Sequence, residues 1–250
     1  MDRELSLVEH LSELRKRLIV CVVSLAIGTI AGFPFASWLL KVLKLPASGV
    51  IEKLVFFSPQ EAFLIYLRLA FFSGIAVSLP VILYQLWLFV SPAVEERFRK
   101  NGSYFILCCL VSFIAGALFA YFILIPPSLK FLLSFAGGDL EPVISASKYI
   151  SFVTSLILGC GLVFQMPVLS LIFTKFGLVN SRILRKKYKY AVVVIFIAAA
   201  IITPTSDVFN MLMLALPMLF LYELSIWISF LTRKRDPVYW TKPKITPQKD

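Results

Sequence analysis

Residues 103–129 read SYFILCCLVSFIAGALFAYFILIPPSL and contain no charged side chain. A helix needs ~20 predominantly apolar residues to cross the hydrocarbon core of a bilayer, so this run is long enough to do so. Three other runs, at 18–40, 69–94 and 149–174, have the same character and sufficient length. The sequence therefore predicts an all-α polytopic membrane protein with at least four helical crossings.

The composition also favours a membrane protein. Of the 250 residues, 59% are hydrophobic and 16% are charged, whereas about a quarter of the residues in a soluble domain carry charge. The formal net charge of +11 could suggest nucleic-acid binding, but the basic residues are spread over short connecting segments without an RNA- or DNA-binding motif. The cysteines lie inside apolar runs, where we expect small core residues and no disulfides: Cys21, Cys108, Cys109 and Cys160.

The number of crossings depends on the last apolar region, residues 190–232. It is interrupted by TPTSD at 203–207, where Ser206 or Asp207 could N-cap a following helix. Lysine and arginine gather in short cytoplasmic loops, and 19 of the 25 lie in alternate segments of this chain: 1–17, 91–101, 175–189 and 231–250. The last two segments are both predicted to be cytoplasmic, so the chain must cross twice between them. We expect six spans, with both termini in the cytoplasm.

The fifth and sixth helices are predicted to be short. The fifth, at 190–203, would extend ~21 Å at ~1.5 Å per residue, which is less than the ~30 Å of the hydrocarbon core. The sixth contains Pro217 and reaches Glu223 after only 15 charge-free residues. We expect one six-helix transmembrane domain over residues 1–232 and a flexible, basic cytoplasmic tail over residues 233–250.

The segment HLSELRKRL at residues 10–18 precedes the first span. Leucines at helical spacing with charges between them predict an interfacial amphipathic helix. The same string resembles the N-terminal motif His-Leu-x-Glu-Leu-Arg-x-Arg-Leu of the TatC family, the polytopic receptor subunits of the twin-arginine protein translocase. Further segments resemble that family in order: FSPQEAF at 57–63, PVILYQLWLF at 80–89, GALFAYF at 116–122 and YISF at 149–152.

The resemblance implies a receptor in the cell inner membrane that binds Arg-Arg signal peptides of folded substrates. Its partners would be single-span proteins of the TatA and TatB type, and the proton-motive force would drive export without a cofactor. A membrane enzyme is not expected, because the single His10 excludes a two-histidine metal site within one chain and no hydrolase or zinc-protease motif occurs. A secondary transporter of a small solute is the alternative, although paired halves with broken helices are not evident.

Carboxylates are the groups that match a planar, permanently charged guanidinium. The resemblance places a functional glutamate at Glu13, and the predicted signal-peptide site also takes in Arg17 of the same motif. Many family members carry a His-Glu pair in the next loop, where this chain has Arg97 and Phe98. Either Glu95 or Glu96 would supply the second carboxylate from a shifted position, or the second arginine would be held otherwise. Alternatively, Glu95 and Glu96 are solvated loop charges without a role in binding. Phe89 would pack against the apolar part of the signal, or serve only as an interfacial aromatic.

Several polar residues fall inside or between the later spans. Gln165 stands where many family members have a glutamate, and an amide can form hydrogen bonds without titrating, so a proton relay at this position is doubtful. Thr203, Asp207 and Asn210 lie where the two short helices would meet, and could contact a partner helix. Glu223 is an acid in the sixth helix, unless it lies near enough to the interface to be hydrated.

The topology can be tested by labelling an introduced cysteine. In a variant without the native cysteines, a thiol at Asp139 should react with a membrane-impermeant maleimide added outside the cell, because residues 126–148 form a predicted external loop. A thiol at Lys186, in a predicted cytoplasmic loop, should react only after the membrane is opened. Labelling of the Asp139→Cys thiol only from the cytoplasmic side would overturn the six-span topology.

Overall fold

The computed structural model describes residues 7–49, 51, 54–91, 102–135, 143–175, 179–205 and 207–232. Their elements are α1 (Leu7–Gly32), the 3-10 turn η1 (Phe33–Phe35), α2 (Ala36–Lys44), η2 (Leu45–Ala47), β1 (Leu54–Val55), α3 (Pro59–Val90), α5 (Gly102–Phe119), the π-helical η4 (Ala120–Leu124), α6 (Ile125–Ser134), β2 (Ile144–Ser145), α7 (Ala146–Val163), α8 (Met166–Lys175), α9 (Ser181–Lys186), α10 (Tyr188–Ile202) and α11 (Val208–Thr232). The described chain is therefore almost entirely helical, as predicted.

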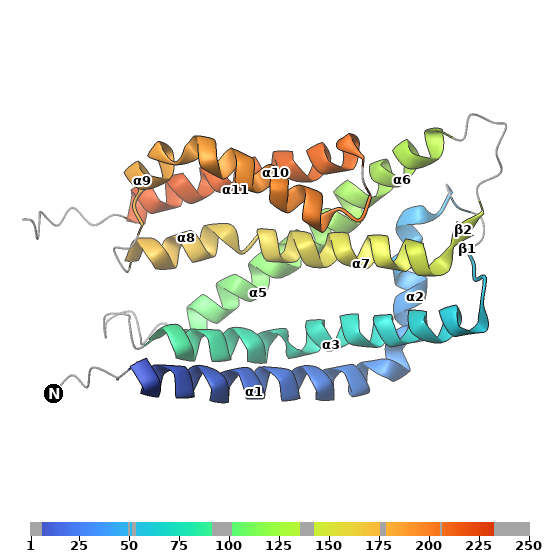
Figure 1. Ribbon diagram of the computed structural model, residues 1–250, viewed down its shortest axis with the longest axis horizontal. Helices are drawn as coiled ribbons and strands as arrows, with labels where there is room; N and C mark the ends of the chain where they lie inside the picture. Colours follow the sequence, from blue (N-terminus) through green and yellow to red (C-terminus); the bar gives the residue numbers. More distant parts are fainter. Residues whose placement is uncertain are drawn as a thin grey trace, which may run out of the picture.

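Five helical stretches of the described chain are long and apolar enough to cross a membrane: Leu11–Ala47, Pro59–Val90, Gly102–Ser134, Ala146–Lys175 and Val208–Thr232. A shorter apolar helix, Tyr188–Ile202, lies between the last two. Figure 1 shows most of these helices running along the long axis of the molecule, while α5 and α6 cross the bundle obliquely. The fold class is confirmed, and six crossings with both termini in the cytoplasm remain a prediction.

The sixth helix is longer than predicted. α11 has 25 residues, which correspond to ~37 Å and suffice for a full crossing. Pro217 is accommodated within the helix, and the Glu223 side chain is 41% exposed and faces Arg185, so neither residue ends it. The prediction of a short sixth helix was therefore wrong, whereas the fifth, α10, is short, with 15 residues.

The predicted amphipathic segment is continuous with the first span. α1 begins at Leu7 and runs without a break to Gly32, because the first proline of the chain is Pro34 and the first glycine is Gly28. Residues 10–18 thus form the opening turns of a long helix, and their charged side chains are held in a fixed register with the apolar part.

The contact between α1 and α3 is built on small residues. A Cβ added to Gly28 would lie 2.8 Å from the carbonyl oxygen of Gly74, and one added to Gly74 would lie 2.7 Å from the backbone nitrogen of Thr29. A Cβ added to Gly32, one turn beyond Gly28, would lie 1.9 Å from the Ser73 hydroxyl oxygen. Close approach through small residues is a common way for helices to associate in lipid, where the hydrophobic effect offers no drive.

The end of the molecule that carries α2 is joined by long-range hydrogen bonds. The Tyr121 hydroxyl donates to the Val42 carbonyl at 2.7 Å, and the Tyr149 hydroxyl donates to the Leu43 carbonyl at 2.6 Å. These carbonyls lie in the last turn of α2, beyond the reach of N–H groups of the same helix, and the Val42 carbonyl also accepts from the Leu45 backbone N–H of η2. At the same end, β1 pairs in parallel with β2, so the segments that precede α3 and α7 are tied together.

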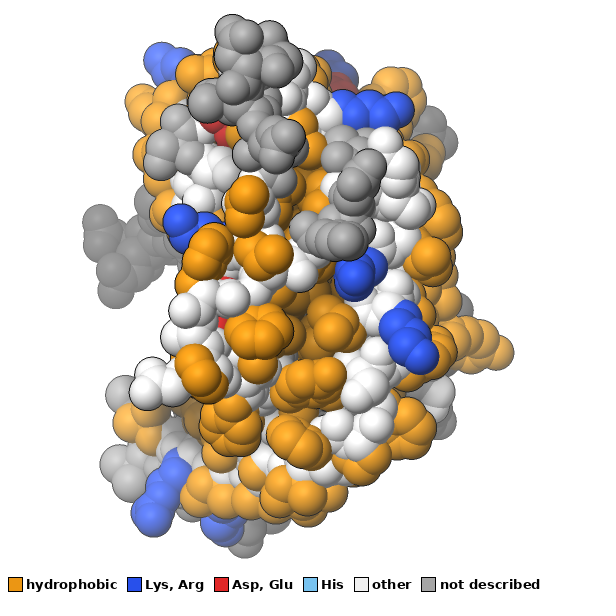
Figure 2. Space-filling view, turned by 90° about the vertical axis from the view of Figure 1, so that its right-hand side faces the viewer, with side chains coloured by type: hydrophobic (Ala, Val, Ile, Leu, Met, Phe, Trp, Pro, Cys, Tyr) orange, Lys and Arg blue, Asp and Glu red, His pale blue; other side chains and the backbone are white. Residues whose placement is uncertain are grey.

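Figure 2 views the molecule from this end. Apolar side chains run down the middle of the face, with lysines and arginines scattered around them. The exposed apolar residues at this end include Leu45, Phe56, Phe57 and Val143, each more than half exposed. A surface with aromatic and cationic side chains fits the boundary between hydrocarbon and headgroups.

The α1–α3 contact predicts the effect of a bulky substitution. Gly28→Leu should push α1 away from α3 and lower the free energy of unfolding in detergent by about 1–3 kcal/mol, the usual cost of overpacking. The measurement is the midpoint of denaturant-induced loss of helicity. Ala26→Leu is the matched control, because Ala26 is exposed on the same helix. Equal midpoints for the two variants would contradict the packing argument.

Candidate functional site

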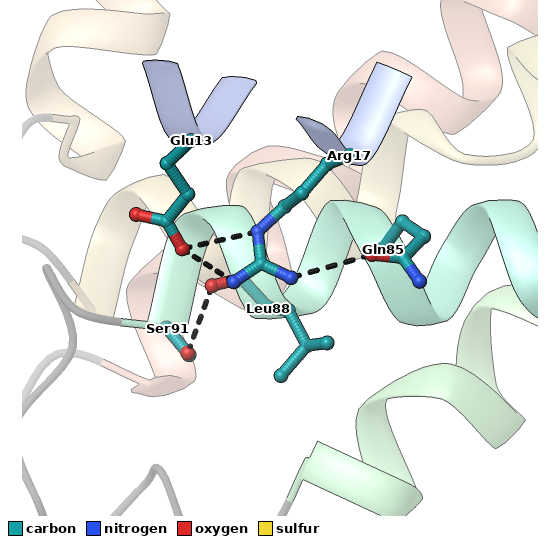
Figure 3. A network of polar contacts seen from close by, with 5 residues as sticks. All are labelled: Glu13, Arg17, Gln85, Leu88 and Ser91. Atoms are coloured by element: carbon teal, nitrogen blue, oxygen red, sulfur yellow. Dashed lines mark hydrogen bonds and ion pairs between the residues drawn. The ribbon is translucent and has the colours of Figure 1, made fainter. Parts of the chain in front are cut away.

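The candidate site lies where α1 begins and α3 ends, at one end of the bundle (Figure 1). Arg17 Nε donates to Glu13 Oε1 at 3.1 Å, and Arg17 Nη2 donates to the same oxygen. Arg17 Nη1 donates to Gln85 Oε1 at 3.3 Å, so one guanidinium connects α1 with α3 (Figure 3). Glu13 and Arg17 are one helical turn apart, a spacing at which side chains meet.

Only one of the two oxygens of the Glu13 carboxylate takes part in these contacts. Both hydrogen bonds from Arg17 go to Oε1, and within the described part of the chain Oε2 accepts none. The side chains of Arg17 and Glu13 are 22% and 26% exposed, so the pair is partly desolvated but open to an incoming ligand. The geometry therefore presents a carboxylate that its own arginine orients and whose second oxygen is available.

The end of α3 forms the neighbouring wall of the site. Phe89 is half-buried and lies four residues after Gln85, hence on the same side of the helix. Trp87 is buried beneath, with its ring 4.7 Å from that of Phe105, and Ser91 donates to the Leu88 carbonyl at 3.2 Å. The structure thus brings Glu13, Arg17 and Phe89 to the same end of one helix pair.

Two of the predicted site residues, Glu95 and Glu96, lie outside the described residues. Their role as the source of a second carboxylate stays a prediction. Both follow α3 by only a few residues in sequence.

Gln165 has a structural role at a break in the predicted fourth helix. α7 ends at Val163 and α8 begins at Met166, next to Pro167, which has no N–H group to donate within a helix. Gln165 Nε2 donates to the Cys109 carbonyl at 2.9 Å, and the Ser112 hydroxyl donates to the Phe164 carbonyl. Both bonds join the break to α5. The Gln165 amide makes its hydrogen bond at the break without carrying a titratable proton.

The connection between α10 and α11 brings Asp207 and Asn210 together. Asp207 Oδ1 accepts from the Asn210 backbone N–H at 2.7 Å, which caps α11, and Oδ2 accepts from Asn210 Nδ2 at 2.8 Å. Asn210 Nδ2 also donates to Thr205 at 3.1 Å. Thr203 is separate from these contacts, because its hydroxyl donates back to the Ala199 carbonyl at 2.8 Å.

The acid of this cluster is held ionised. Partial burial alone would raise the pKa of Asp207, but hydrogen bonds from the Asn210 backbone, the Thr205 hydroxyl and the Asn210 amide outweigh it. The pKa of Asp207 therefore lies below its ordinary value. Asn210 Oδ1 is buried and has no hydrogen-bond partner among the described residues.

Glu223 lies far from that cluster. It is 16 residues beyond Asp207, about 24 Å along the helix axis. Its Oε1 is 3.8 Å from Arg185 Nη2 of α9, and the adjacent Tyr222 hydroxyl donates to the Leu184 carbonyl at 2.9 Å. The predicted group of five polar residues is thus split over three places in the bundle.

The sequence interpretation assigned no role to Gln85 or Glu61. Gln85 is a single polar residue in an apolar run, four residues before Phe89, which is the signal that could have pointed to it. The Glu61 carboxylate accepts from the Phe57 N–H at 2.8 Å, the Ser147 N–H at 3.3 Å and the Ser145 hydroxyl. It connects the start of α3 to the start of α7, and the pattern Ser-Pro-x-Glu of a helix N-terminus is its signal.

Comparison with known proteins identifies the family of this chain. The family model described as Sec-independent protein translocase protein (TatC) matches residues 9–217. The TatC protein of Carboxydothermus hydrogenoformans is 37% identical over 235 residues, which cover 94% of this chain and 97% of that one. The TatC protein of Aquifex aeolicus is 38% identical over 237 residues, which cover 93% and 98%.

A solved structure extends the agreement to three dimensions. A crystal structure described as the twin-arginine translocase receptor TatC superposes with a TM-score of 0.82 at 37% sequence identity, and the match covers 90% of this chain and 99% of that one. The resemblance drawn from the sequence motifs is confirmed over nearly the whole chain. The chain belongs to the TatC family of Sec-independent protein translocase proteins.

Proposed function

We propose that this protein is the receptor subunit that binds Arg-Arg signal peptides of folded substrates at the end of the bundle where α1 begins. The membrane would be the cell inner membrane, with both termini in the cytoplasm. The observation that carries the proposal is the Glu13 carboxylate, which Arg17 holds by one oxygen while the other accepts no hydrogen bond from the described residues. Membership of a translocase family supports this function and argues against the alternative of a small-solute transporter.

The arrangement suits a guanidinium ligand. An incoming arginine would donate to Glu13 Oε2, while Arg17 keeps its bonds to Oε1 and to Gln85. Charge-assisted hydrogen bonds of this kind are short and strong, and the planar guanidinium is favoured over an ammonium because two of its N–H groups can donate to one oxygen, as those of Arg17 do to Oε1. Since Arg17 already balances the charge of Glu13, the second signal arginine needs another acid, and Glu95 or Glu96 would provide it.

The hydrophobic part of the signal would continue along α3. Phe89 is half-buried at the end of this helix, one turn from Gln85. An apolar segment that leaves the arginine site towards the bilayer would pass this ring. Transport itself would be driven by the proton-motive force, in line with the absence of a phosphate-binding glycine-rich motif from the sequence.

Membership of this family also implies a translocase complex with single-span partners of the TatA and TatB type. We propose that α10 and the start of α11 form the partner contact. α10 is short, so a neighbouring helix would reduce the local mismatch with the bilayer. Its outward residues are apolar and more than half exposed, among them Val193, Val194, Ile197 and Ile201, and the partly exposed Asp207 stands at its far end.

Peptide binding tests the receptor role. Purified protein in detergent should bind an Arg-Arg signal peptide more tightly than its Lys-Lys counterpart. Glu13→Gln should weaken Arg-Arg binding by about 10- to 150-fold, because a charged hydrogen bond of ~1.5–3 kcal/mol is lost. Fluorescence anisotropy of a labelled peptide provides the measurement.

Glu223→Gln is the matched control for this experiment. It removes the same charge from the same end of the bundle, but from α11 and away from α1 and α3. The control should bind the peptide as the unchanged protein does. Equal affinity of the unchanged protein for Arg-Arg and Lys-Lys peptides would rule out the receptor proposal.

Crosslinking tests the partner contact. A cysteine at Ile201, which is 78% exposed on α10, should crosslink to a cysteine in the membrane helix of a TatA- or TatB-type partner. A cysteine at Val77, which is 63% exposed on α3, should not. Asp207→Ala should lower the crosslinked fraction by about 3- to 30-fold if a polar contact of ~0.6–2 kcal/mol is lost. Equal crosslinking from Ile201 and Val77 would count against this surface.

A further inference from the structure

A cavity opens at the same end of the bundle as Glu13, between α9 and α11. Its volume is about 410 Å³. Its lining combines cationic, hydroxyl and apolar side chains: Ser181, Arg182, Arg185, Ile226, Trp227 and Phe230. The signal-peptide and partner contacts proposed above use none of these residues.

The lining is held in place by an ordered element. Asn180 Oδ1 accepts from the Ile183 N–H at 2.9 Å and so caps α9. The Tyr222 hydroxyl donates to the Leu184 carbonyl at 2.9 Å, which fastens α9 to α11, and Ser181 is buried at their contact. The backbone that carries the two arginines is therefore held before a ligand binds, and only their side chains have to be ordered.

The cavity carries positive charge that the described residues do not balance. Arg182 makes no ion pair with another described residue, and Arg185 faces Glu223 at 3.8 Å with 67% of its side chain exposed. Two guanidinium groups thus stand against one carboxylate. Arginine is well suited to phosphate, which accepts its paired N–H groups in a bidentate manner. The charge points to a phosphate-bearing ligand.

The apolar side chains of the lining further restrict the class of ligand that fits the cavity. Ile226 is buried at the base, while Trp227 and Phe230 are 56% and 65% exposed along the last turns of α11. α10 begins at Tyr188, a single residue after α9 ends, so the cavity lies where the bundle leaves the hydrocarbon. A soluble anion would leave these apolar side chains unused, whereas a lipid presents a phosphate and an acyl chain at this level.

We propose that this cavity is a binding site for an anionic phospholipid of the adjacent leaflet. The headgroup phosphate accepts hydrogen bonds from Arg182 and Arg185, and the first part of an acyl chain packs against Trp227 and Phe230. The site goes beyond the receptor function, since it lies on α9 and α11 and not on α1 and α3. A bound lipid would brace α9 against α11.

The test is lipid retention by the purified full-length protein, measured by native mass spectrometry after titration with phosphatidylglycerol. The unchanged protein should hold phosphatidylglycerol more tightly than phosphatidylcholine. Arg182→Gln/Arg185→Gln should weaken phosphatidylglycerol binding by about 10- to 30-fold, the combined effect of two cations at a membrane surface. Arg182→Lys/Arg185→Lys should lose less, because the charge remains while bidentate bonding does not.

Lys187→Gln/Lys189→Gln is the matched control. These lysines come from the same basic segment, but their ammonium groups lie over the Tyr190 ring, each 5.4 Å from its centre, and do not line the cavity. The control should retain the lipid. The arginine variant should also bind the Arg-Arg peptide normally, which shows that it is folded and separates this test from that of the receptor role.

Three results would overturn the proposal. The first is an equal loss of lipid from the arginine and lysine variants, which would indicate unspecific attraction to the membrane. The second is equal retention of phosphatidylglycerol and phosphatidylcholine by the unchanged protein. The third is competition by inorganic phosphate or glycerol phosphate at the same concentration as the lipid, which would indicate a soluble anion as the ligand.

Discussion

A backbone N–H or C=O group without a hydrogen-bond partner costs several kcal/mol in hydrocarbon, because no water is present to replace the partner. Where a helix of this chain stops inside the bundle, another group has to supply the missing hydrogen bond. The Tyr149 hydroxyl does so for the Leu43 carbonyl in the last turn of α2, and the Ser112 hydroxyl does so for the Phe164 carbonyl at the break that follows α7. The side chains of Tyr121 and Gln165 add hydrogen bonds to the Val42 and Cys109 carbonyls. Many of the polar side chains in the spans are explained first by this requirement and only then by function.

The positions of the spans could be predicted because a charge-free run is a property of the sequence alone. The length of α11 could not, because a charged residue such as Glu223 ordinarily ends a charge-free run. A carboxylate that reaches a solvated guanidinium on α9 does not stop a helix, and that contact is invisible in the sequence. The break near Gln165 was missed for a related reason: a proline is tolerated in a span when a neighbouring helix supplies the missing hydrogen bonds.

The candidate site likewise has one part that the sequence predicts and one part that it does not. The Glu13–Arg17 pair is local, four residues apart on one helix, so the motif already contained it. The contact from Arg17 to Gln85 bridges 68 positions of the sequence. It depends on the register between α1 and α3, which the close approach of Gly28 and Gly74 sets. Sequence patterns predict the local half of such a site, while the other half follows from how two helices happen to meet.

The hydroxyl contacts on α2 bear on how the molecule is assembled. During synthesis, the first helices enter the membrane before Tyr149 and the strand residues Ile144 and Ser145 exist. The carbonyl of Leu43 and the backbone of β1 receive these partners only when the chain has grown by about another hundred residues. This end of the bundle must therefore be completed late, after α7 has been inserted, so a chain truncated before that point would leave the Leu43 carbonyl and the backbone of β1 without these partners.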